Sequence, residues 1–248
     1  MSFFNIQLIK KPWAIFGLLL SALVVFGLVL FVVQVGKYAF QINAGETNPF
    51  EADRLKVSVT SFLLQAPIYD VDQSRILSGS QDPALGSANA KIQIVEFVDY
   101  ECPVSKSAAS EIRAFMMRHP DDVLFIVRDF PLESIHNNAM NAALAARCVF
   151  EQGDDEKYWK FHDLLFKYQI SLNEADLKSF VQAVGVDESD YDRCFSSRAH
   201  ESTIQKSIED GMAAGVRGTP TFFINGRRVP GAMNLATLEL IYNEMNKE

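Results

Sequence analysis

The sequence predicts an α/β fold, a central β-sheet with helices on both faces, preceded by one transmembrane helix. Two mostly apolar segments rich in β-branched residues, 92–98 and 123–127, flank a helical segment and are typical of a parallel β-α-β unit. Two further strands meet at Asn225-Gly226, which is a strong hairpin signal. An uninterrupted apolar run, residues 13–33, is long enough to cross a bilayer.

Length and composition exclude several classes of protein. With 248 residues, of which 48% are hydrophobic, the chain can bury a substantial core. Its net charge of −8 and its lack of a concentrated basic segment argue against nucleic-acid binding. Three cysteines are too few for a disulfide framework, and none has the C-x2-C spacing of a zinc site. Their odd number predicts one unpaired thiol if the domain lies outside the cytosol.

The apolar run from Trp13 to Val33 contains Ser21 as its only polar side chain. About 20 such residues span the roughly 30 Å hydrocarbon core as a helix. The alternative is a cleaved signal peptide, whose apolar region is about 7–15 residues long and ends at a small-x-small site. The run in this chain is longer, and the segment after it, QVGKYAFQINAG, offers only poor cleavage candidates. We therefore expect an uncleaved anchor over residues 13–35.

The charges around the anchor predict its orientation. Lys10 and Lys11 precede the run, whereas Lys37 is the one cation close behind it. The positive-inside rule then places residues 1–12 in the cytoplasm and the rest of this single-pass protein outside the cell membrane, where disulfides persist. Residues 36–84 form a juxtamembrane linker that is polar and turn-rich at both ends and more apolar in between.

Residues 85–248 form the folded domain, and residues 92–98 are its first buried strand. Pro103 opens the next helix, because the first turn of a helix does not need its missing N–H, and this helix ends before Pro120. The strand at residues 123–127 completes the parallel unit.

A helical insertion follows at about residues 137–216. Its segments include NAALAARCVFEQ, KYWKFHDLLFKYQ and NEADLKSFVQAVG, the last of which ends at Gly185 as a C-cap. The segments TFFI and RRV then form the predicted hairpin. Apolar residues at helical spacing predict a closing amphipathic helix: Leu235, Leu238, Ile241, Tyr242 and Met245.

Cys102 is the first candidate for chemistry, because it stands where a strand ends and a helix begins. The free N–H groups and the dipole at a helix N-terminus stabilise a thiolate, which is the nucleophilic form. Glu101 acts in the opposite direction, since a neighbouring carboxylate disfavours a second negative charge. The alternative is a buried cysteine without a chemical role. A second candidate is Thr219-Pro220 before a strand, where the peptide bond can be cis or, more commonly, trans.

Together these segments resemble the DsbA-like thiol–disulfide oxidoreductases of the thioredoxin-fold superfamily. The resemblance covers about Asp82 to the C-terminus and is carried by DPALG, IVEFVDYECP, RDFPL followed by His136, AALAARC, KYWKFHDLLF and GVRGTPTFFINGRRVPGA. It implies a thioredoxin fold, β-α-β … β-β-α, with a helical insertion. It also implies that Cys102 is the nucleophile, that Pro220 is a cis-proline beside it, and that Thr219 offers backbone groups to a substrate strand.

The same resemblance assigns roles around the Cys102-Pro103 motif. Glu96 matches an acidic residue on the first strand, which is expected behind the site and able to assist proton transfer. Ser105 departs from the family, which has a second cysteine at this position. Cys102 can therefore form a mixed disulfide, but Ser105 cannot resolve it. An external thiol has to complete the exchange.

The remaining cysteines, Cys148 and Cys194, look similar to the structural disulfide that some DsbA-like proteins carry in the helical domain. The alternatives are two unpaired buried cysteines, or one of the two resolving Cys102. The four histidines are scattered and have no metal-ligand spacing, so we expect no metal site and no cofactor. His162 is expected to pack in a helix, and His136 could lie nearer the site.

The sequence thus predicts an extracytoplasmic, membrane-anchored thiol–disulfide exchange protein, isomerase-like or reductase-like, acting through Cys102. Its expected partners are cysteine-containing exported proteins and a thiol or redox partner that resolves the mixed disulfides. One alternative is a non-catalytic binding or chaperone module that keeps a peptide groove around Pro220. Another is that Ser105 is an engineered replacement in a dithiol CPVC site.

Overall fold

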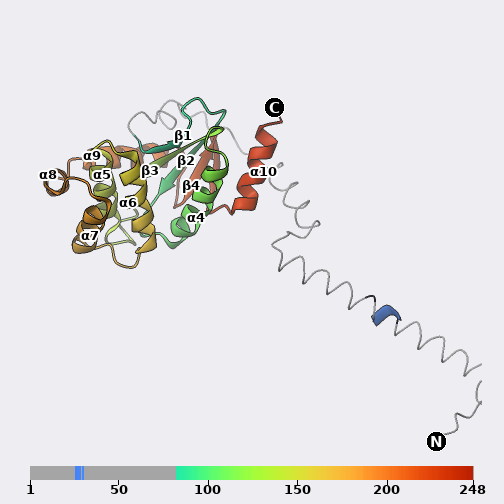
Figure 1. Cartoon of the computed structure of the whole chain (residues 1–248), viewed down its shortest axis with the longest axis horizontal. Coiled ribbons are helices and arrows are strands. Elements are labelled where there is room, and N and C mark those ends of the chain that lie inside the picture. The colour runs from blue at the N-terminus through green and yellow to red at the C-terminus, as the bar shows by residue number, and fades with distance from the viewer. Residues whose placement is uncertain (1–25, 29, 31–81, 248) are drawn as a thin grey trace, which may run out of the picture. The chain divides into compact units, whose positions relative to one another are not determined.

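The computed structural model describes residues 26–28, 30 and 82–247 of the chain. The elements of the domain are, in order, β1 (Ala84–Gly86), β2 (Ile92–Val98), α4 (Pro103–Arg118), β3 (Val123–Asp129), α5 (Ala139–Phe150), α6 (Asp155–Lys167), α7 (Glu174–Val184), α8 (Glu188–Ser196), α9 (Glu201–Ala213), β4 (Thr221–Ile224), β5 (Arg227–Pro230) and α10 (Leu235–Met245). This order confirms the predicted β-α-β unit, the helical stretch and the closing β-β-α unit (Figure 1).

The strands form one mixed sheet in the order β1-β3-β2-β4-β5. β2 and β3 are parallel, whereas β1 pairs with β3, β4 with β2, and β5 with β4 in antiparallel register. The predicted hairpin is confirmed: Asn225 and Gly226 both have positive φ, 44° and 80°, as a tight two-residue turn requires. The three-residue strand β1 was not predicted.

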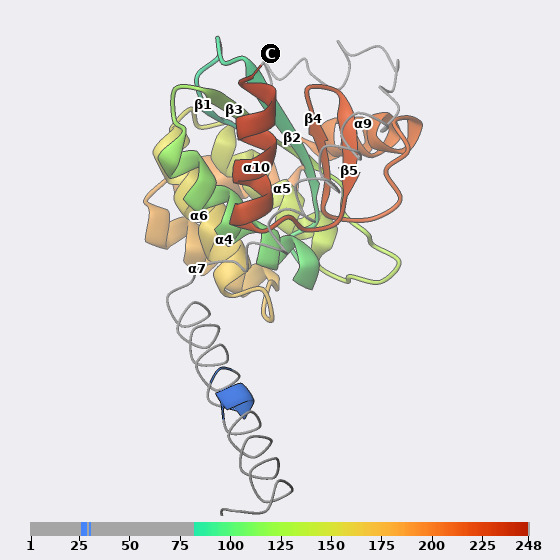
Figure 2. The same cartoon turned by 90° about the vertical axis from the view of Figure 1, so that its right-hand side faces the viewer.

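Alternating side chains of the strands pack into layers on the two faces of the sheet. One face, which includes Ile94 and Phe125, packs against α4 and α10, which lie in front of the sheet in Figure 2. The other face, which includes Phe97, packs under α9. Gly211 of α9 permits this close approach, because a Cβ at that position would lie 2.9 Å from the rings of Phe97 and Phe130.

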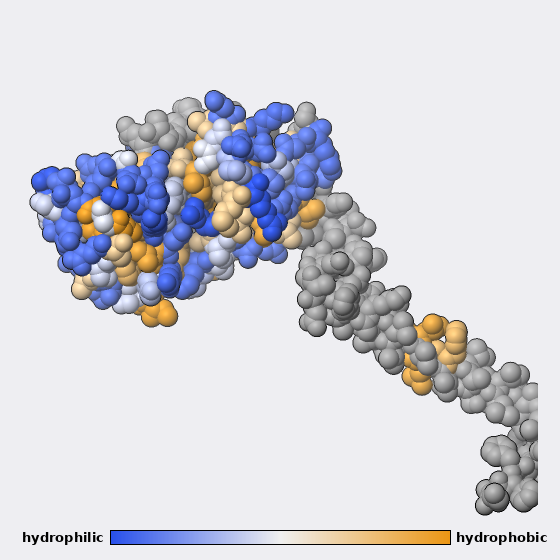
Figure 3. All heavy atoms as spheres, in the orientation of Figure 1, coloured by the Kyte–Doolittle hydropathy of each residue, from blue (hydrophilic) through white to orange (hydrophobic). Residues whose placement is uncertain are grey.

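The helical insertion consists of α5 to α9, and Figure 1 shows it at the end of the domain away from α10. Three of its helices begin with a side-chain cap: Asp154, Asn173 and Asp187 accept hydrogen bonds from N–H groups of the first turn. Gly185 ends α7 in the left-handed conformation, as the sequence predicts. Polar residues cover most of the face of the domain that Figure 3 shows.

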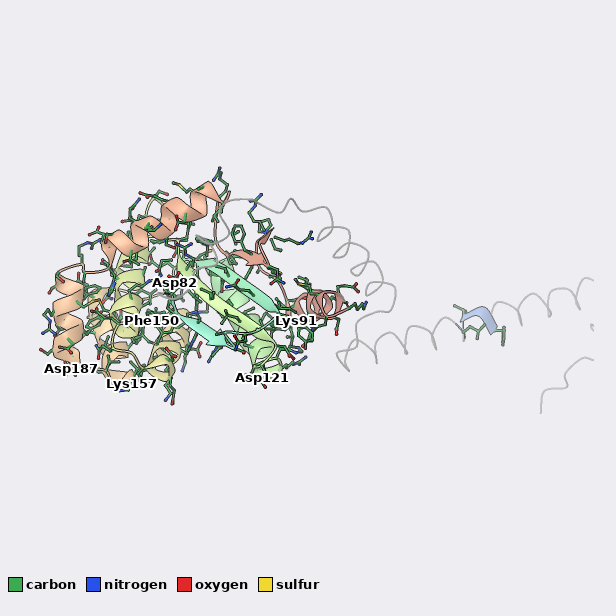
Figure 4. All side chains as sticks on the ribbon, turned by 90° about the horizontal axis from the view of Figure 1, so that it is seen from above. Asp82, Lys91, Asp121, Phe150, Lys157 and Asp187 are labelled. Carbon is green, nitrogen blue, oxygen red and sulfur yellow. A yellow bond between two sulfur atoms is a disulfide. The ribbon has the colours of Figure 1, made fainter. Side chains whose placement is uncertain are left out.

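A buried ionic network holds the start of the domain against the sheet and the insertion. Arg147 of α5 binds Asp129 at 2.5 Å and Asp82 at 2.6 Å, and its side chain is 3% exposed. Arg128 of β3 binds Asp210 at 2.9 Å and lies 3.5 Å from Asp82, which Figure 4 labels beside the sheet. The packed domain therefore includes Asp82, three residues before the predicted start at residue 85.

In the part of the chain that the structure describes, no helix is both long and apolar enough to span a bilayer. The anchor predicted at residues 13–35 lies outside that part, apart from the helical residues 26–28 and 30. Of the predicted linker, residues 36–81 also lie outside it. The anchor, its orientation and the linker stay predictions.

Candidate active site

Cys102 lies at the turn between β2 and α4. It is the N-cap residue of α4, with extended backbone angles, and Pro103 follows in the first helical turn. Its N–H donates to the carbonyl of Asp99 at 3.1 Å, and its own carbonyl accepts the N–H of Lys106 at 3.1 Å. The first turn of α4 carries no acidic residue, and the Cys102 side chain caps none of its N–H groups. The thiol is therefore held beside the positive end of the helix.

The thiol of Cys102 meets the second predicted segment directly. Its Sγ donates a hydrogen bond of 3.1 Å to the carbonyl oxygen of Thr219, which lies 117 residues further along the chain. The peptide bond between Thr219 and Pro220 is cis. Pro220 is buried, and its carbonyl accepts the N–H of Gly231 at 2.9 Å. The structure thus brings together the two segments that the sequence singled out separately.

Ser105 lies three residues after Cys102, inside the first turn of α4. It is completely buried, and its Oγ has no hydrogen-bond partner among the residues that the structure describes. Its hydroxyl therefore makes no hydrogen bond to the Cys102 thiol. The serine hydroxyl is buried and is not a thiol, so it cannot displace a disulfide at Cys102.

Glu96 lies in the middle of β2, on the face of the sheet that packs against α4. The side chain is 1% exposed, and its Oε1 has no hydrogen-bond partner within the described part of the chain. Burial raises the pKa of this carboxyl from its ordinary value of 4.5 to about 8. Glu96 is therefore a buried group that can hold or release a proton near neutral pH.

Glu101, next to Cys102, is turned away into a contact that the sequence did not predict. Its carboxylate accepts the backbone N–H of Asn138 at 2.6 Å and the side-chain amide of the same residue at 2.9 Å. Asn138 is the N-cap of α5, so the negative charge of Glu101 lies at the positive end of a second helix. This contact opposes the unfavourable influence on a Cys102 thiolate that we expected from Glu101.

Asp99 organises the other side of the turn. Its fully buried carboxylate accepts the N–H groups of Glu101 and Leu132, both at 2.8 Å, and lies 2.8 Å from Nδ1 of His136. From the sequence we expected that His136 could lie nearer the site, and we gave no role to Asp99, which is part of the IVEFVDYECP segment. The signal available was the carboxylate directly after a buried strand, three residues before the cysteine.

Gln169, in the loop after α6, is the residue that sequence reasoning could not have found. Its side-chain amide donates to the carbonyl oxygens of Tyr100 and Cys102, both at 2.8 Å. The insertion therefore contributes a direct contact to the turn that carries the thiol. His162, by contrast, is buried among the rings of Tyr100, Trp159 and Phe166, and burial lowers its pKa.

The three cysteines divide into a pair and a single thiol. Cys148 of α5 and Cys194 of α8 form a disulfide, with their Cα atoms 5.8 Å apart. Cys102 is the free cysteine of the described residues. It is 7% exposed, so a narrow part of its surface reaches solvent. Neither of the other cysteines is available to resolve a mixed disulfide at Cys102 while they remain bonded to each other.

Comparison with known proteins identifies the fold. A family model described as Thioredoxin matches residues 78–243. A thioredoxin-like oxidoreductase from Silicibacter pomeroyi DSS-3 is similar with a TM-score of 0.63 and 26% identity, over 71% of this chain and 98% of that one. The thiol-disulfide exchange protein alpha-DsbA2 from Wolbachia pipientis has a TM-score of 0.62 and 23% identity, over 81% and 99%. Oxidised BdbD from Bacillus subtilis has a TM-score of 0.58 and 23% identity, over 68% and 93%.

The relatives found by sequence similarity are proteins named as sodium–proton antiporters. The Na(+)/H(+) antiporter NhaA 3 of Salinispora tropica is 32% identical to this chain over 158 residues, which are 64% of this chain and 24% of that protein. Na(+)/H(+) antiporter NhaA 1 of Mycolicibacterium vanbaalenii is 32% identical over 168 residues, 66% of this chain and 26% of that protein. This chain therefore spans about a quarter of the length of these relatives, and the name of each relative refers to the whole antiporter.

The family match includes both segments of the candidate site. Residues 78–243 contain the turn with Cys102 and the cis-proline at Pro220, together with all five strands of the sheet. The solved structures that share this fold include alpha-DsbA2 from Wolbachia pipientis, which is described as a thiol-disulfide exchange protein. The chain belongs to the thioredoxin family.

Proposed function

We propose that this protein exchanges thiols and disulfides with cysteine-containing exported proteins through the single thiol of Cys102. The observation that carries the proposal is the position of this thiol. It is the one free cysteine in the described part of the chain, it caps a helix N-terminus, and it contacts the carbonyl before a cis-proline. A helix N-terminus favours the thiolate, which is the attacking species.

The exchange starts when Cys102 loses its proton and, with it, the hydrogen bond to Thr219. The thiolate attacks one sulfur of a substrate disulfide, a new S–S bond forms, and the second substrate sulfur leaves as a thiolate. Glu96 serves as the proton carrier behind the site, because its pKa of about 8 lets both of its forms exist near neutral pH. Thr219 and the cis-proline present backbone groups to the substrate strand.

The mixed disulfide cannot be resolved from within α4, because Ser105 has no thiol. A second thiol of the same substrate resolves it by attacking the substrate sulfur, which releases Cys102 as a thiolate and leaves the substrate rearranged without net oxidation. A thiol of a redox partner can also attack the substrate sulfur and release Cys102. The substrate is then disulfide-bonded to that partner, and resolution of this second mixed disulfide reduces the substrate. This chemistry is isomerase-like or reductase-like.

We also propose that the domain lies outside the cell membrane on an uncleaved N-terminal anchor, with residues 1–12 in the cytoplasm. The apolar run from Trp13 to Val33 and the lysines before it support this orientation. The disulfide between Cys148 and Cys194 is in keeping with an oxidising compartment.

The experiment uses the full chain with reduced Cys102 and a protein substrate with scrambled disulfides. We expect a mixed disulfide, seen by mass spectrometry without reductant, and recovery of the native substrate. Cys102→Ala abolishes both, whereas Ser107→Ala, an exposed change in the same helix, preserves both. The proposal is wrong if Cys102→Ala and the unchanged protein behave alike. Client binding that survives Cys102→Ala without any exchange would instead support a binding module.

A further inference from the structure

A second cluster of metal-ligating side chains lies at the far end of α5. A carboxylate oxygen of Glu151, a ring nitrogen of His200 and Sγ of Cys194 all lie within 4.8 Å of one another, and no other such group occurs in the part of the chain that the structure describes. Sγ of Cys148 is bonded to Sγ of Cys194. Asn138, which contacts the Cys102 turn, caps the opposite end of α5, about 18 Å away along the helix.

We infer that reduction of the Cys148–Cys194 disulfide turns this cluster into a Zn²⁺ site formed by Cys148, Cys194, His200 and Glu151. The inference is independent of the function proposed for Cys102. Two thiolates, one imidazole and one carboxylate are a donor set that Zn²⁺ accepts in tetrahedral geometry. The sequence did not indicate it, because the ligands are spaced C-x2-E and C-x5-H on three different helices.

The ends of three helices hold the four ligands together. Cys148 and Glu151 are three residues apart at the end of α5 and therefore lie on the same side of it. Cys194 lies near the end of α8, and His200 caps the beginning of α9. The turn between these two helices is closed by the N–H of Ala199, which donates to the carbonyl of Cys194 at 3.1 Å. Figure 1 shows α5, α8 and α9 gathered at one end of the domain.

In the disulfide form, the nitrogen and oxygen ligands already face each other. Nε2 of His200 lies 2.9 Å from a carboxylate oxygen of Glu151, and these side chains are 24% and 56% exposed. A metal ion bound between these two atoms needs only a small movement of the two side chains. The two sulfurs must move apart to about 3.8 Å, the separation that two Zn–S bonds of about 2.3 Å impose at a tetrahedral angle.

The disulfide can be reached from the surface. Both cysteines and Glu151 line a pocket of about 340 Å³, and Cys194 is 8% exposed whereas Cys148 is 1% exposed. Cys194 is the more exposed of the two residues, and we infer that a thiolate entering this pocket attacks its Sγ. In-line attack there breaks the S–S bond and releases Cys148 as the leaving thiolate.

The reaction balances with a dithiol as reductant. One thiolate of the reductant forms a mixed disulfide with Cys194, and Cys148 takes up a proton. The second thiol of the reductant then displaces Cys194, which is also protonated, so that two electrons and two protons enter the protein and the reductant becomes a disulfide. Binding of Zn²⁺ finally releases the two thiol protons.

The test uses the full chain carrying Cys102→Ala, so that the thiol of the proposed active site contributes nothing. The chain is reduced with a dithiol, freed of reductant, equilibrated with Zn²⁺ and desalted, and its metal content is measured. We expect one Zn²⁺ per reduced chain and none per oxidised chain. Replacement of Zn²⁺ by Co²⁺ gives the near-ultraviolet absorption of cobalt–thiolate bonds.

Variants of the nitrogen and oxygen ligands complete the test. His200→Ala and Glu151→Gln weaken Zn²⁺ binding at least tenfold, whereas His119→Ala, which removes a histidine bound to Glu239, leaves it unchanged. Zn²⁺ also raises the thermal unfolding temperature of the reduced chain. The inference fails if the reduced chain retains no Zn²⁺, if the oxidised chain retains as much, or if neither His200→Ala nor Glu151→Gln changes the affinity.

Discussion

The side-chain amide of Gln169 donates a hydrogen bond of 2.8 Å to the backbone carbonyl of Cys102, 67 residues earlier in the chain. The same amide donates to the carbonyl of Tyr100 at 2.8 Å. One residue of the helical insertion thus satisfies two carbonyls of the turn between β2 and α4. This contact makes the position of the Cys102 thiol depend on the loop after α6 as well as on the sheet.

Gln169→Ala removes both donors and leaves the two carbonyls to solvent. We expect a loss of about 1–3 kcal/mol in the free energy of unfolding, together with faster alkylation of Cys102, because the turn opens more often. The rate of reaction with iodoacetamide, followed by mass spectrometry on the full chain, measures the second effect. Gln182→Ala in α7, which removes an exposed hydrogen bond to Glu188 of α8, is the matched control. An unchanged rate in Gln169→Ala would show that the insertion does not hold the turn.

Ser105→Cys supplies the thiol that the site lacks. An internal thiol acts at an effective concentration on the order of mM, so we expect the mixed disulfide at Cys102 to be resolved at least about tenfold faster than with a micromolar external thiol. Its lifetime is read from non-reducing gels after rapid acid quench. Ser105→Ala is the control, and it keeps the long lifetime. Equal lifetimes in the two variants would contradict the role given to Ser105.

Glu96→Gln removes a buried carboxyl whose pKa burial raises to about 8. When the pKa of a carboxyl is higher in the folded than in the unfolded state, its contribution to stability is complete at pH values below the pKa of the unfolded state. That contribution is lost as the pH rises toward 8. At about 1.4 kcal/mol for each pH unit above the unfolded pKa, the loss at pH 7 is on the order of 3 kcal/mol.

We therefore expect Glu96→Gln to match the unchanged protein in free energy of unfolding near pH 4.5 and to exceed it at pH 8. Urea unfolding of the full chain at several pH values measures the difference. Glu209→Gln, a change at an exposed position of α9, should show no such dependence on pH. Parallel pH curves for Glu96→Gln and the unchanged protein would rule out a raised pKa at Glu96.

Arg147→Met breaks the buried ionic network at its centre. Asp129 and Asp82 then lose their shared partner at 2.5 and 2.6 Å, and breaking a buried pair in this way costs about 3–5 kcal/mol. Arg193→Met removes the exposed ion pair with Asp190 and should cost at most about 1 kcal/mol. Urea unfolding measures the free energy of unfolding of both variants. An equal decrease in the two would mean that burial does not make the contacts of Arg147 more important for stability than an exposed ion pair.

Local sequence patterns predict the elements of this fold well, and they predict the contacts between distant elements poorly. The hairpin at Asn225-Gly226 follows from the conformational freedom of two residues, so it can be recognised locally. The strand β1 has only three residues, too few for a periodic signal, and it is fixed by its pairing with β3.

The candidate site also combines features that local sequence predicts with contacts that it does not predict. Cys102 can be proposed from its place between a strand and a helix, whereas its contact with Thr219 follows only from the resemblance to a known family. The partners Asn138 and Gln169 could not be predicted, because each contributes a side-chain hydrogen bond from a loop or helix start whose path depends on the packed fold. The same holds for His200 beside Cys194.

The two arginines around Asp82 have a mechanical consequence. Asp82 precedes β1, which runs antiparallel to the edge of β3, and the carbonyl of Pro83 accepts the N–H of Val127 at 3.0 Å. Tension on the chain before Asp82 would act first on the pairing of β1 with β3 and on the contacts of Asp82 with Arg128 and Arg147. Arg128 and Arg147 would pass such a force on to β3 and α5, the elements that carry them.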